Sequence, residues 1–186
     1  MANKTTFELE SNVDEVIQKM GSEAEERVEK AVHRVRNEIN ETLTGDRSGE
    51  RYQMPSDDTE QEIRQEAERA VSRLPSKVSF SQQTGPSGNV YKVPGTTQTY
   101  YQASAPGEPP ASRLGYLRST IGWFVERNQG ILGKGLEIRG TIGSPMPYSP
   151  FLEFGTSKMK KRPFFYPSFK KARRDVRRIL GGRKWF

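Results

Sequence analysis

Apolar residues recur at steps of three and four over the first quarter of the chain. They are Val13, Val16, Ile17, Met20, Ala24, Val28, Ala31, Val32, Val35, Ile39 and Leu43. This spacing places them on one stripe of a helix, which the capping-box pair Asn12 and Glu15 starts and Gly45 ends. At 1.5 Å per residue such a helix is roughly 45 Å long, more than a small domain needs. We therefore expect part of the stripe to face another subunit.

The pattern changes after Thr44 and contains an internal echo. Residues 48–55, SGERYQMP, and residues 87–94, SGNVYKVP, share the pattern Ser-Gly-x-x-Tyr-x-x-Pro. This predicts either a duplicated turn-and-strand unit or a coincidence of turn chemistry. Between the copies, residues 57–75 predict a short helix with acidic residues in its first turn. Its narrow apolar stripe consists of Ile63, Ala67, Ala70, Val71 and Leu74. We interpret residues 45–85 as a loop insertion bounded by similar hairpin turns.

Alternating apolar residues predict two antiparallel strands in the second half of the chain. On one face lie Ile121, Trp123 and Val125 of the first strand and Leu136, Ile138, Gly140 and Ile142 of the second. Residues 128–135, NQGILGKG, are rich enough in glycine to join the two strands as a hairpin loop.

Prolines and glycines shape the segments on either side of this hairpin. Residues 105–110, APGEPP, cannot be helical because proline removes backbone donors, so we expect a stiff extended arm. Residues 148–154 predict a turn of helix closed by Gly155, and a last, basic helix begins at Pro163 or Pro167. The predicted class is α+β, with a long N-terminal amphipathic helix packed on a small antiparallel sheet, a long extended loop or arm insertion, and a basic C-terminal helix. We expect a single domain over residues 1–186, ending in a basic tail at 181–186.

Composition and charge restrict the partners of such a domain. Hydrophobic residues make up 32% of the chain and charged residues 28%, which predicts a small core and much loop. The net charge is +7, but twelve basic residues and one acid lie between Lys158 and Lys184. The basicity is therefore local and predicts a polyanion or an acidic protein face as partner, or else a solvated helix face. The N-terminus lacks an apolar signal region and no stretch approaches a membrane span, so we predict a soluble chain without a visible export signal.

Residues that could support catalysis are sparse. The chain has no cysteine, which excludes disulfides, a thiolate nucleophile and cysteine-based zinc sites. The one histidine, His33, lies beside the stripe of the long helix and has no acidic cluster or thiol near it in the sequence. Glu153 and Asp175 could form a carboxylate pair, but basic residues surround both and favour ion pairing instead. We predict that the chain is not an enzyme and holds no cofactor or metal.

Two ordered motifs resemble the tail-completion family of long-tailed phages, the lambdoid minor tail component also called a neck or head-tail joining protein. The first is SAPGEPP at residues 104–110, continued by Gly115, Leu117 and Ile121. The second resembles the family pattern Tyr-Ala-x-x-x-Glu-x-Gly-Thr-x-x-Met-x-x-x-Pro-Phe-x-x-Pro, with Ser149 in place of the alanine. Its positions are occupied here by Tyr148, Glu153, Gly155, Thr156, Met159, Pro163, Phe164 and Pro167. The resemblance covers about residues 86–180 and leaves out the 45–85 segment and the tail.

The resemblance implies a structural role in the virion. The family suggests a ring of identical subunits, a hexamer, placed in the head-tail neck between the head-closure stopper and the tail terminator. The ring would complete the tail so that it joins the DNA-filled head, after assembly in the host cytoplasm. Packaged double-stranded DNA would pass through the lumen, and no membrane is involved.

We predict two sets of functional residues on this basis. The predicted ring interface contains Ala105, Pro106, Gly107, Glu108, Pro109, Pro110, Tyr148, Phe151, Glu153, Phe154, Gly155, Thr156, Met159, Pro163 and Phe164. The predicted DNA-facing or partner-facing basic set contains Lys160, Lys161, Arg162, Lys170, Lys171, Arg173, Arg174, Arg177 and Arg178. Two alternatives remain at this stage: a stand-alone basic nucleic-acid-binding protein, and another neck component, either the tail terminator or the head-closure stopper.

Overall fold

Helices and short antiparallel strands make up the described part of the protein, a computed structural model covering residues 13–54, 57–80, 90–92, 99–111, 114–129 and 136–181. The helices are α1 (Val13–Thr44), α2 (Asp57–Ser72), α3 (Tyr116–Ser119), α4 (Ser149–Phe154) and α5 (Phe165–Gly181). The strands are β1 (Arg51–Gln53), β2 (Ser79–Phe80), β3 (Val90–Lys92), β4 (Thr99–Gln102), β5 (Gly122–Gln129) and β6 (Leu136–Gly143). The predicted α+β class is confirmed.

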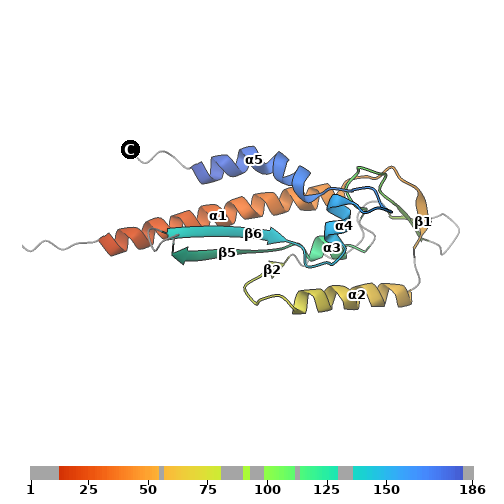
Figure 1. Cartoon of the computed structure of the whole chain (residues 1–186), viewed down its shortest axis with the longest axis horizontal. Coiled ribbons are helices and arrows are strands. Elements are labelled where there is room, and N and C mark those ends of the chain that lie inside the picture. Colours follow the sequence, from red (N-terminus) through yellow and green to blue (C-terminus); the bar gives the residue numbers. More distant parts are fainter. Residues whose placement is uncertain are drawn as a thin grey trace, which may run out of the picture.

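Helix α1 forms the middle layer of the molecule. Figure 1 shows α5 along one side of α1 and the β5–β6 hairpin along the other. The hairpin is antiparallel, with Trp123 opposite Ile142. Gly140 of β6 lets the helix approach closely, because a Cβ atom there would lie 2.4 Å from Val32 and 2.9 Å from Val28. The close approach explains why β6 carries a glycine on its predicted inward face.

The core forms where the three layers meet. Val35, Ile39 and Leu43 of α1 are buried there with Ile121, Phe164 and Ala172. The three α1 residues belong to the apolar stripe predicted from the sequence, and the stripe forms the core because α5 and the hairpin cover it on both sides. Ser168 of α5 is also fully buried, and its hydroxyl donates a 2.8 Å hydrogen bond to the Thr42 hydroxyl.

The two copies of the internal echo are strands of one small sheet. Strands β1 and β3 both pair antiparallel with β4, one on each side, in the order β1-β4-β3. Tyr52 of the first copy lies opposite Tyr101, and Tyr91 of the second lies opposite Tyr100. The described strand of each copy therefore pairs with β4, while the turn residues 87–89 of the second copy lie outside the described residues.

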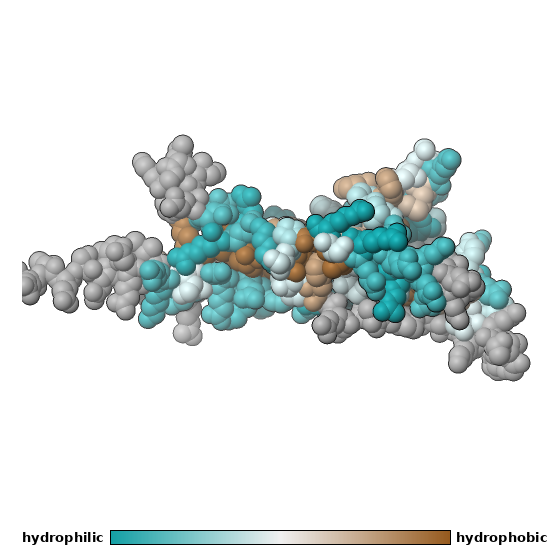
Figure 2. All heavy atoms as spheres, turned by 90° about the horizontal axis from the view of Figure 1, so that it is seen from below, coloured by the Kyte–Doolittle hydropathy of each residue, from teal (hydrophilic) through white to brown (hydrophobic). Residues whose placement is uncertain are grey.

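The segment between the copies extends the molecule on the hairpin side. Helix α2 lies on the opposite side of the molecule from α5 (Figure 1), and its Ala67 is only 4% exposed. Strand β2 follows α2 and adds to the hairpin at β5, with Phe80 opposite Gly122. Seen from below, the side on which α2 lies, the surface is mostly hydrophilic and hydrophobic residues gather in patches along its middle (Figure 2).

Element boundaries lie close to the predictions, with shifts at the start of α5 and at the end of β5. Helix α5 begins at Phe165, between the two predicted starts Pro163 and Pro167, because Glu153 caps its first turn. The predicted hairpin loop 128–135 starts too early, because antiparallel pairing with β6 continues through Asn128 and Gln129 of β5. The rest of that loop at 130–135, the predicted cap Asn12 and the tail beyond Gly181 lie outside the described residues. In the described ranges, no helix combines the length and the apolar character needed to cross a bilayer.

Candidate functional site

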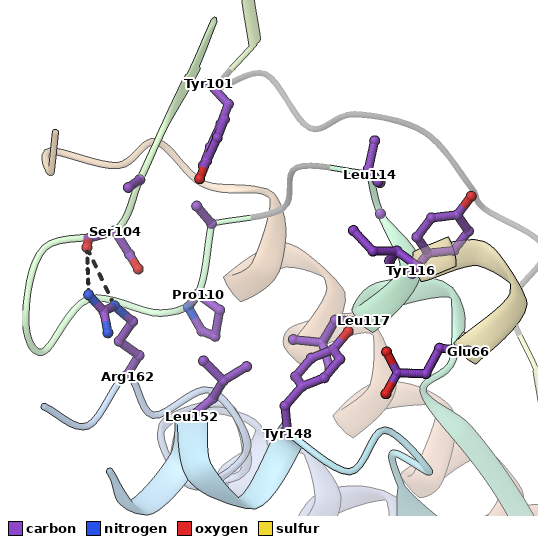
Figure 3. A pocket seen from close by; sticks show the side chains of 14 residues that line it. Glu66, Tyr101, Ser104, Pro110, Leu114, Tyr116, Leu117, Tyr148, Leu152 and Arg162 are labelled. Carbon is purple, nitrogen blue, oxygen red and sulfur yellow. Dashed lines mark hydrogen bonds between the residues drawn. The ribbon is translucent and has the colours of Figure 1, made fainter. Parts of the chain in front are cut away.

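The two motifs that carry the family resemblance lie against each other. The backbone N–H of Gly107, in the first motif, donates a 3.1 Å hydrogen bond to the carbonyl of Lys161 in the second. The guanidinium of Arg162 donates to the carbonyl of Ser104 at 3.3 and 3.4 Å (Figure 3). Residues 104–111 are therefore docked on their own chain by contacts between the motifs. We call this joined unit, residues 104–111 and 153–164, the arm–turn unit.

Glu153 of the arm–turn unit caps helix α5. Its Oε2 accepts hydrogen bonds from the backbone N–H groups of Phe164 and Phe165 at 2.8 and 3.0 Å, and its Oε1 accepts one from Tyr166 at 2.9 Å. These N–H groups are at the start of a helix and have no partner within it. A negative charge is also favourable at the positive end of the helix dipole. Glu153 thus fixes the position of α5 relative to α4 and is not placed as a catalytic acid.

The Gly-Thr pair closes the turn between α4 and α5. Gly155 has a φ of 80°, and a Cβ atom there would lie 2.9 Å from backbone atoms of Met159 and Lys161. The Thr156 hydroxyl accepts hydrogen bonds from the N–H groups of Lys158 and Met159, and its own N–H donates to the Met159 carbonyl at 2.8 Å. The residue types in the motif are therefore explained by the geometry of the turn.

Glu108 ties the arm to the loop after α1. Its carboxylate accepts hydrogen bonds from the N–H and hydroxyl of Ser48 at 3.1 and 2.5 Å, and from the N–H of Ala105 at 2.8 Å. These bonds, led by the Ser48 hydroxyl, lower the pKa of Glu108 to about 2. The carboxylate is therefore charged at neutral pH and holds two loops together.

Sequence reasoning missed Arg47, which anchors the same region from the other side. Its side chain is buried and donates to the carbonyls of Thr42, Gly45 and Asp46 at 2.6 to 2.8 Å, at the C-terminal end of α1. It also donates to the carbonyl of Pro110 at 3.1 and 3.3 Å. Burial lowers the pKa of Arg47 from its ordinary value. The only local signal was a basic residue just after a helix end, which is common on protein surfaces.

The predicted interface residues separate into buried and exposed groups. Phe164 has no exposed surface and packs in the core of its own chain, so it does not present a surface to a neighbouring subunit. Phe151 and Phe154 of α4 are 55% and 80% exposed. Pro110 is buried in the arm. Half-buried positions are Ala105, Glu108, Pro109, Tyr148, Glu153, Gly155, Met159 and Pro163, and exposed ones are Pro106, Gly107 and Thr156.

An apolar groove opens beside the exposed aromatic rings. It has a volume of about 800 Å³ and lies between the end of β6, the 144–150 segment, α4 and the first turns of α5. Its walls include Ile142, Pro145, Met146, Pro147, Pro150, Phe154, Phe165, Tyr166 and Phe169, with Val35 of α1 at its base. Tyr166 and Phe169 are 70% and 50% exposed. We call this the α4–α5 groove.

Phe154 also borders a second, more polar hollow. This hollow, of about 540 Å³, is lined by Pro106 and Gly107 of the arm and by Lys160 and Lys161 of the turn. Both lysines are exposed, whereas the neighbouring Arg162 is half-buried by its contact with the arm. Of the three basic residues predicted here, two are therefore available to a partner and one stabilises the arm–turn unit.

A third hollow, shown in Figure 3, separates α2 from the arm and α3. It has a volume of about 500 Å³, and its walls are largely apolar, with Ile63, Leu114 and Leu152 among them. The Tyr148 ring lies next to the Glu66 carboxylate, and burial, followed by that negative charge, raises the pKa of Tyr148 to about 12. A hydroxyl with a raised pKa and one exposed carboxylate do not form an acid–base pair suited to catalysis near neutral pH.

The basic residues of α5 are all exposed: Lys170, Lys171, Arg173, Arg174, Arg177 and Arg178. Lys171 lies 3.6 Å from Glu38 of α1, and Arg178 lies 3.0 Å from Asp175. The predicted ion pairing of Asp175 is confirmed, since Arg34 also contacts it at 2.9 Å and lowers its pKa. Among the described residues, Lys170, Arg173 and Arg177 form no ion pair.

His33 packs edge-on against Trp123, with ring centroids 5.1 Å apart, and lies 3.7 Å from Glu29. In the part of the chain that the structure describes, no three His, Asp or Glu side chains are grouped so that they could hold a metal ion. Comparison of the chain with family models, curated proteins and solved structures finds no match. Functional inference therefore depends on the motifs and on the geometry described above.

Proposed function

We propose that this chain is a structural subunit of the neck of a long-tailed phage, a tail-completion protein that forms a ring and joins the tail to the head. The observation that carries the proposal is the arm–turn unit. Its two halves belong to the two motifs that resemble the family, and direct hydrogen bonds join them, among them those between Ser104 and Arg162, 58 positions apart in the sequence. Glu153, Gly155 and Thr156 each have a defined structural role there.

The exposed aromatic surface supports a role in assembly. Phe151, Phe154, Tyr166 and Phe169 are between 50% and 80% exposed. With about 200 Å² for each full side chain, these four expose about 500 Å², the size of the largest apolar patch on typical monomers. A standard protein interface buries about 800 Å² on each partner, so this surface would supply much of one side. A subunit that meets a neighbour here would remove costly apolar area from water.

Rigid geometry is the second requirement of a ring, because rings close only when the rotation between subunits is fixed. Here α4, the turn and α5 are fixed to one another by the Glu153 cap and by the N–H of Arg162, which donates to the Leu152 carbonyl at 2.7 Å. The exposed rings are carried by these fixed helices. An interface built on them would therefore hold a constant angle between subunits.

A complementation experiment tests this function. Lysates of the encoding phage that lack this chain should accumulate separate heads and tails, and added wild-type chain should join them, as counted by electron microscopy. The double variant Phe151→Ser and Phe154→Ser should fold normally, because both rings are exposed, yet join few particles. Tyr52→Ser, which removes an exposed ring from β1, is the matched control. Infectious particles that form equally well without the chain would refute the proposal.

A stand-alone nucleic-acid-binding protein is the second candidate, favoured by the unpaired basic side chains on α5. Contacts to phosphates release counterions, so three such contacts predict that log affinity falls with log salt at a slope of about −3. Binding of free duplex with that slope, together with normal joining of heads and tails in the absence of the chain, would favour this candidate. Other neck components, the terminator and the stopper, are distinguished by locating the labelled chain in virion images.

A further inference from the structure

Met20, near the beginning of helix α1, is an apolar residue that its own chain leaves largely exposed. Val13, Val16, Ile17 and Met20 continue, at steps of three and four, the stripe that is buried further along the helix. Ile39 and Leu43 on this stripe are 0% and 1% exposed, whereas Met20 is 61% exposed. An amphipathic helix with an uncovered apolar stripe is a common element of protein recognition. We call residues 13–29 the α1 start.

The α1 start carries negative charge. Residues 13–29 contain six acidic and two basic residues, a net charge of −4. Among them, Glu23 and Glu25 lie on the turns that follow Met20. A partner that covers this helix should therefore offer an apolar surface with basic residues beside it.

The α4–α5 groove has the complementary character. Its walls are apolar and aromatic, and α5, which borders it, carries six basic residues and one acid, a net charge of +5. Arg173 and Arg177 follow the groove residue Phe169 at steps of four, so they extend the same row along the helix. Both are exposed and form no ion pair among the described residues. The groove and its row of arginines thus match an acidic amphipathic helix.

We propose that the α1 start of one copy docks in the α4–α5 groove of a second copy of this chain. The contact cannot form within one chain: Met20 and the groove residue Val35 are 15 positions apart on the same helix, about 22 Å. Figure 1 shows the α1 start and α4 towards opposite ends of the molecule. The two surfaces differ, so the contact is head to tail, the type that can close into a ring. This inference rests on the proposed ring and names the surfaces that build it.

Sedimentation of the full chain tests the contact over a range of protein concentrations. Met20→Glu places a charge in the groove and Phe169→Ser removes a groove wall, so each should weaken self-association about tenfold or more. Tyr166→Ser is the second groove variant, used where Phe169→Ser lowers the stability of the fold. Tyr52→Ser, an exposed ring on β1, should associate like wild type.

Mixing the two single-site variants gives a sharper result. The Met20→Glu chain keeps an intact groove and the Phe169→Ser chain keeps an intact α1 start, so one good contact remains in the mixture. At a concentration where wild type assembles and neither variant alone does, a head-to-tail contact predicts that the mixture forms dimers and nothing larger. Larger assemblies in the mixture, or a mixture that stays monomeric, would overturn the proposal.

Charge reversal separates a second copy from nucleic acid as the occupant of the basic row. Glu23→Arg with Glu25→Arg, and Arg173→Glu with Arg177→Glu, should each weaken association, and the two variants mixed should recover it. Arg69→Glu on α2 together with Arg73→Glu just after it is the control with the same change of charge and should associate like wild type. Loss of duplex binding without loss of self-association in the arginine variant would assign the row to nucleic acid instead.

Different results would refute the proposed contact between copies and the proposed function in the neck. If wild-type chain is monomeric at every concentration, or if association survives both Met20→Glu and Phe169→Ser, the inferred contact is wrong, and the joining of heads to tails is unaffected as a proposal. If association depends on both residues but lysates join heads to tails without the chain, the contact stands and the neck function is wrong.

Discussion

The cap of α5 by Glu153 gives the most direct test of how the arm–turn unit is held together. The variant Glu153→Ala removes three hydrogen-bond acceptor contacts of 2.8 to 3.0 Å and leaves the N–H groups of Phe164, Phe165 and Tyr166 without this partner. Loss of a single N-cap contact costs about 1 kcal/mol and at most about 2. Loss of the interaction between the charge and the helix dipole adds about 0.3 to 1 kcal/mol.

We therefore expect Glu153→Ala to lower the free energy of unfolding by about 2 to 3 kcal/mol. Glu153→Gln keeps a neutral acceptor oxygen and should cost about half as much. Urea unfolding followed by circular dichroism measures both, and a loss of 2 kcal/mol corresponds to a shift of the midpoint by about 1 M for a slope near 2 kcal/mol per M. Glu62→Ala, a change of an exposed glutamate on α2, is the control and should stay within about 0.5 kcal/mol of wild type.

Amide hydrogen exchange locates the effect. The N–H groups of Phe164, Phe165 and Tyr166 should be protected in wild type and exchange faster in Glu153→Ala, while amides in the middle of α1 change only with global stability. If Glu153→Ala unfolds within about 0.5 kcal/mol of wild type and protection at these three amides is unchanged, the assignment of Glu153 as the cap is refuted.

Three further predictions concern other contacts of the fold. The charged Glu108 carboxylate stabilises the fold at pH values above 4.5, the ordinary pKa of the group, because its pKa in the folded protein is lowered to about 2. This stabilisation is lost as the pH falls from 4.5 towards 2. The difference in urea midpoint between wild type and Glu108→Gln should therefore disappear over that pH range. Gly140→Ala should cost about 1 to 3 kcal/mol in thermal unfolding because its Cβ would lie 2.4 Å from Val32, and an equal or higher stability contradicts this close approach. Arg47→Met should lower the free energy of unfolding in urea by about 3 kcal/mol, because carbonyl groups such as that of Pro110 lose their charged donor. An unchanged free energy of unfolding would show that water takes over the hydrogen bonds of the Arg47 side chain.

Elements with strong periodicity could be predicted from the sequence. The stripe of α1, the helix α2, the alternation along β5 and β6, and the turn of helix at α4 all depend on residues close together in the chain. The start of α5 was less certain because two prolines were both acceptable there. The deciding contact comes from Glu153, which lies outside the helix, so local propensity could not select between them.

Contacts between segments far apart in the chain could not be predicted from the sequence pattern. Phe154 and Phe164 are the same residue type in the same motif, yet Phe154 is exposed and borders the groove, whereas Phe164 is buried in the core. Arg47 is distinguished only by carbonyl groups that the folded arm brings to it, 63 residues away at Pro110. The echo at 48–55 and 87–94 could be recognised as a repeat, but its shared partner β4 follows from long-range pairing.

The packing of α1 against α5 also sets the order in which the protein can be built. The contacts between them join residues far apart in the chain: Arg34 and Asp175 are separated by 141 positions, and Thr42 and Ser168 by 126. Closing such long loops is slow, and a ribosome makes α1 long before α5. Until α5 is made, only the β5–β6 hairpin can cover the α1 stripe, and the α4–α5 groove does not exist. Synthesis therefore completes the core of a chain before the groove exists, so the proposed contact with a second copy can form only after folding of the chain that offers the groove.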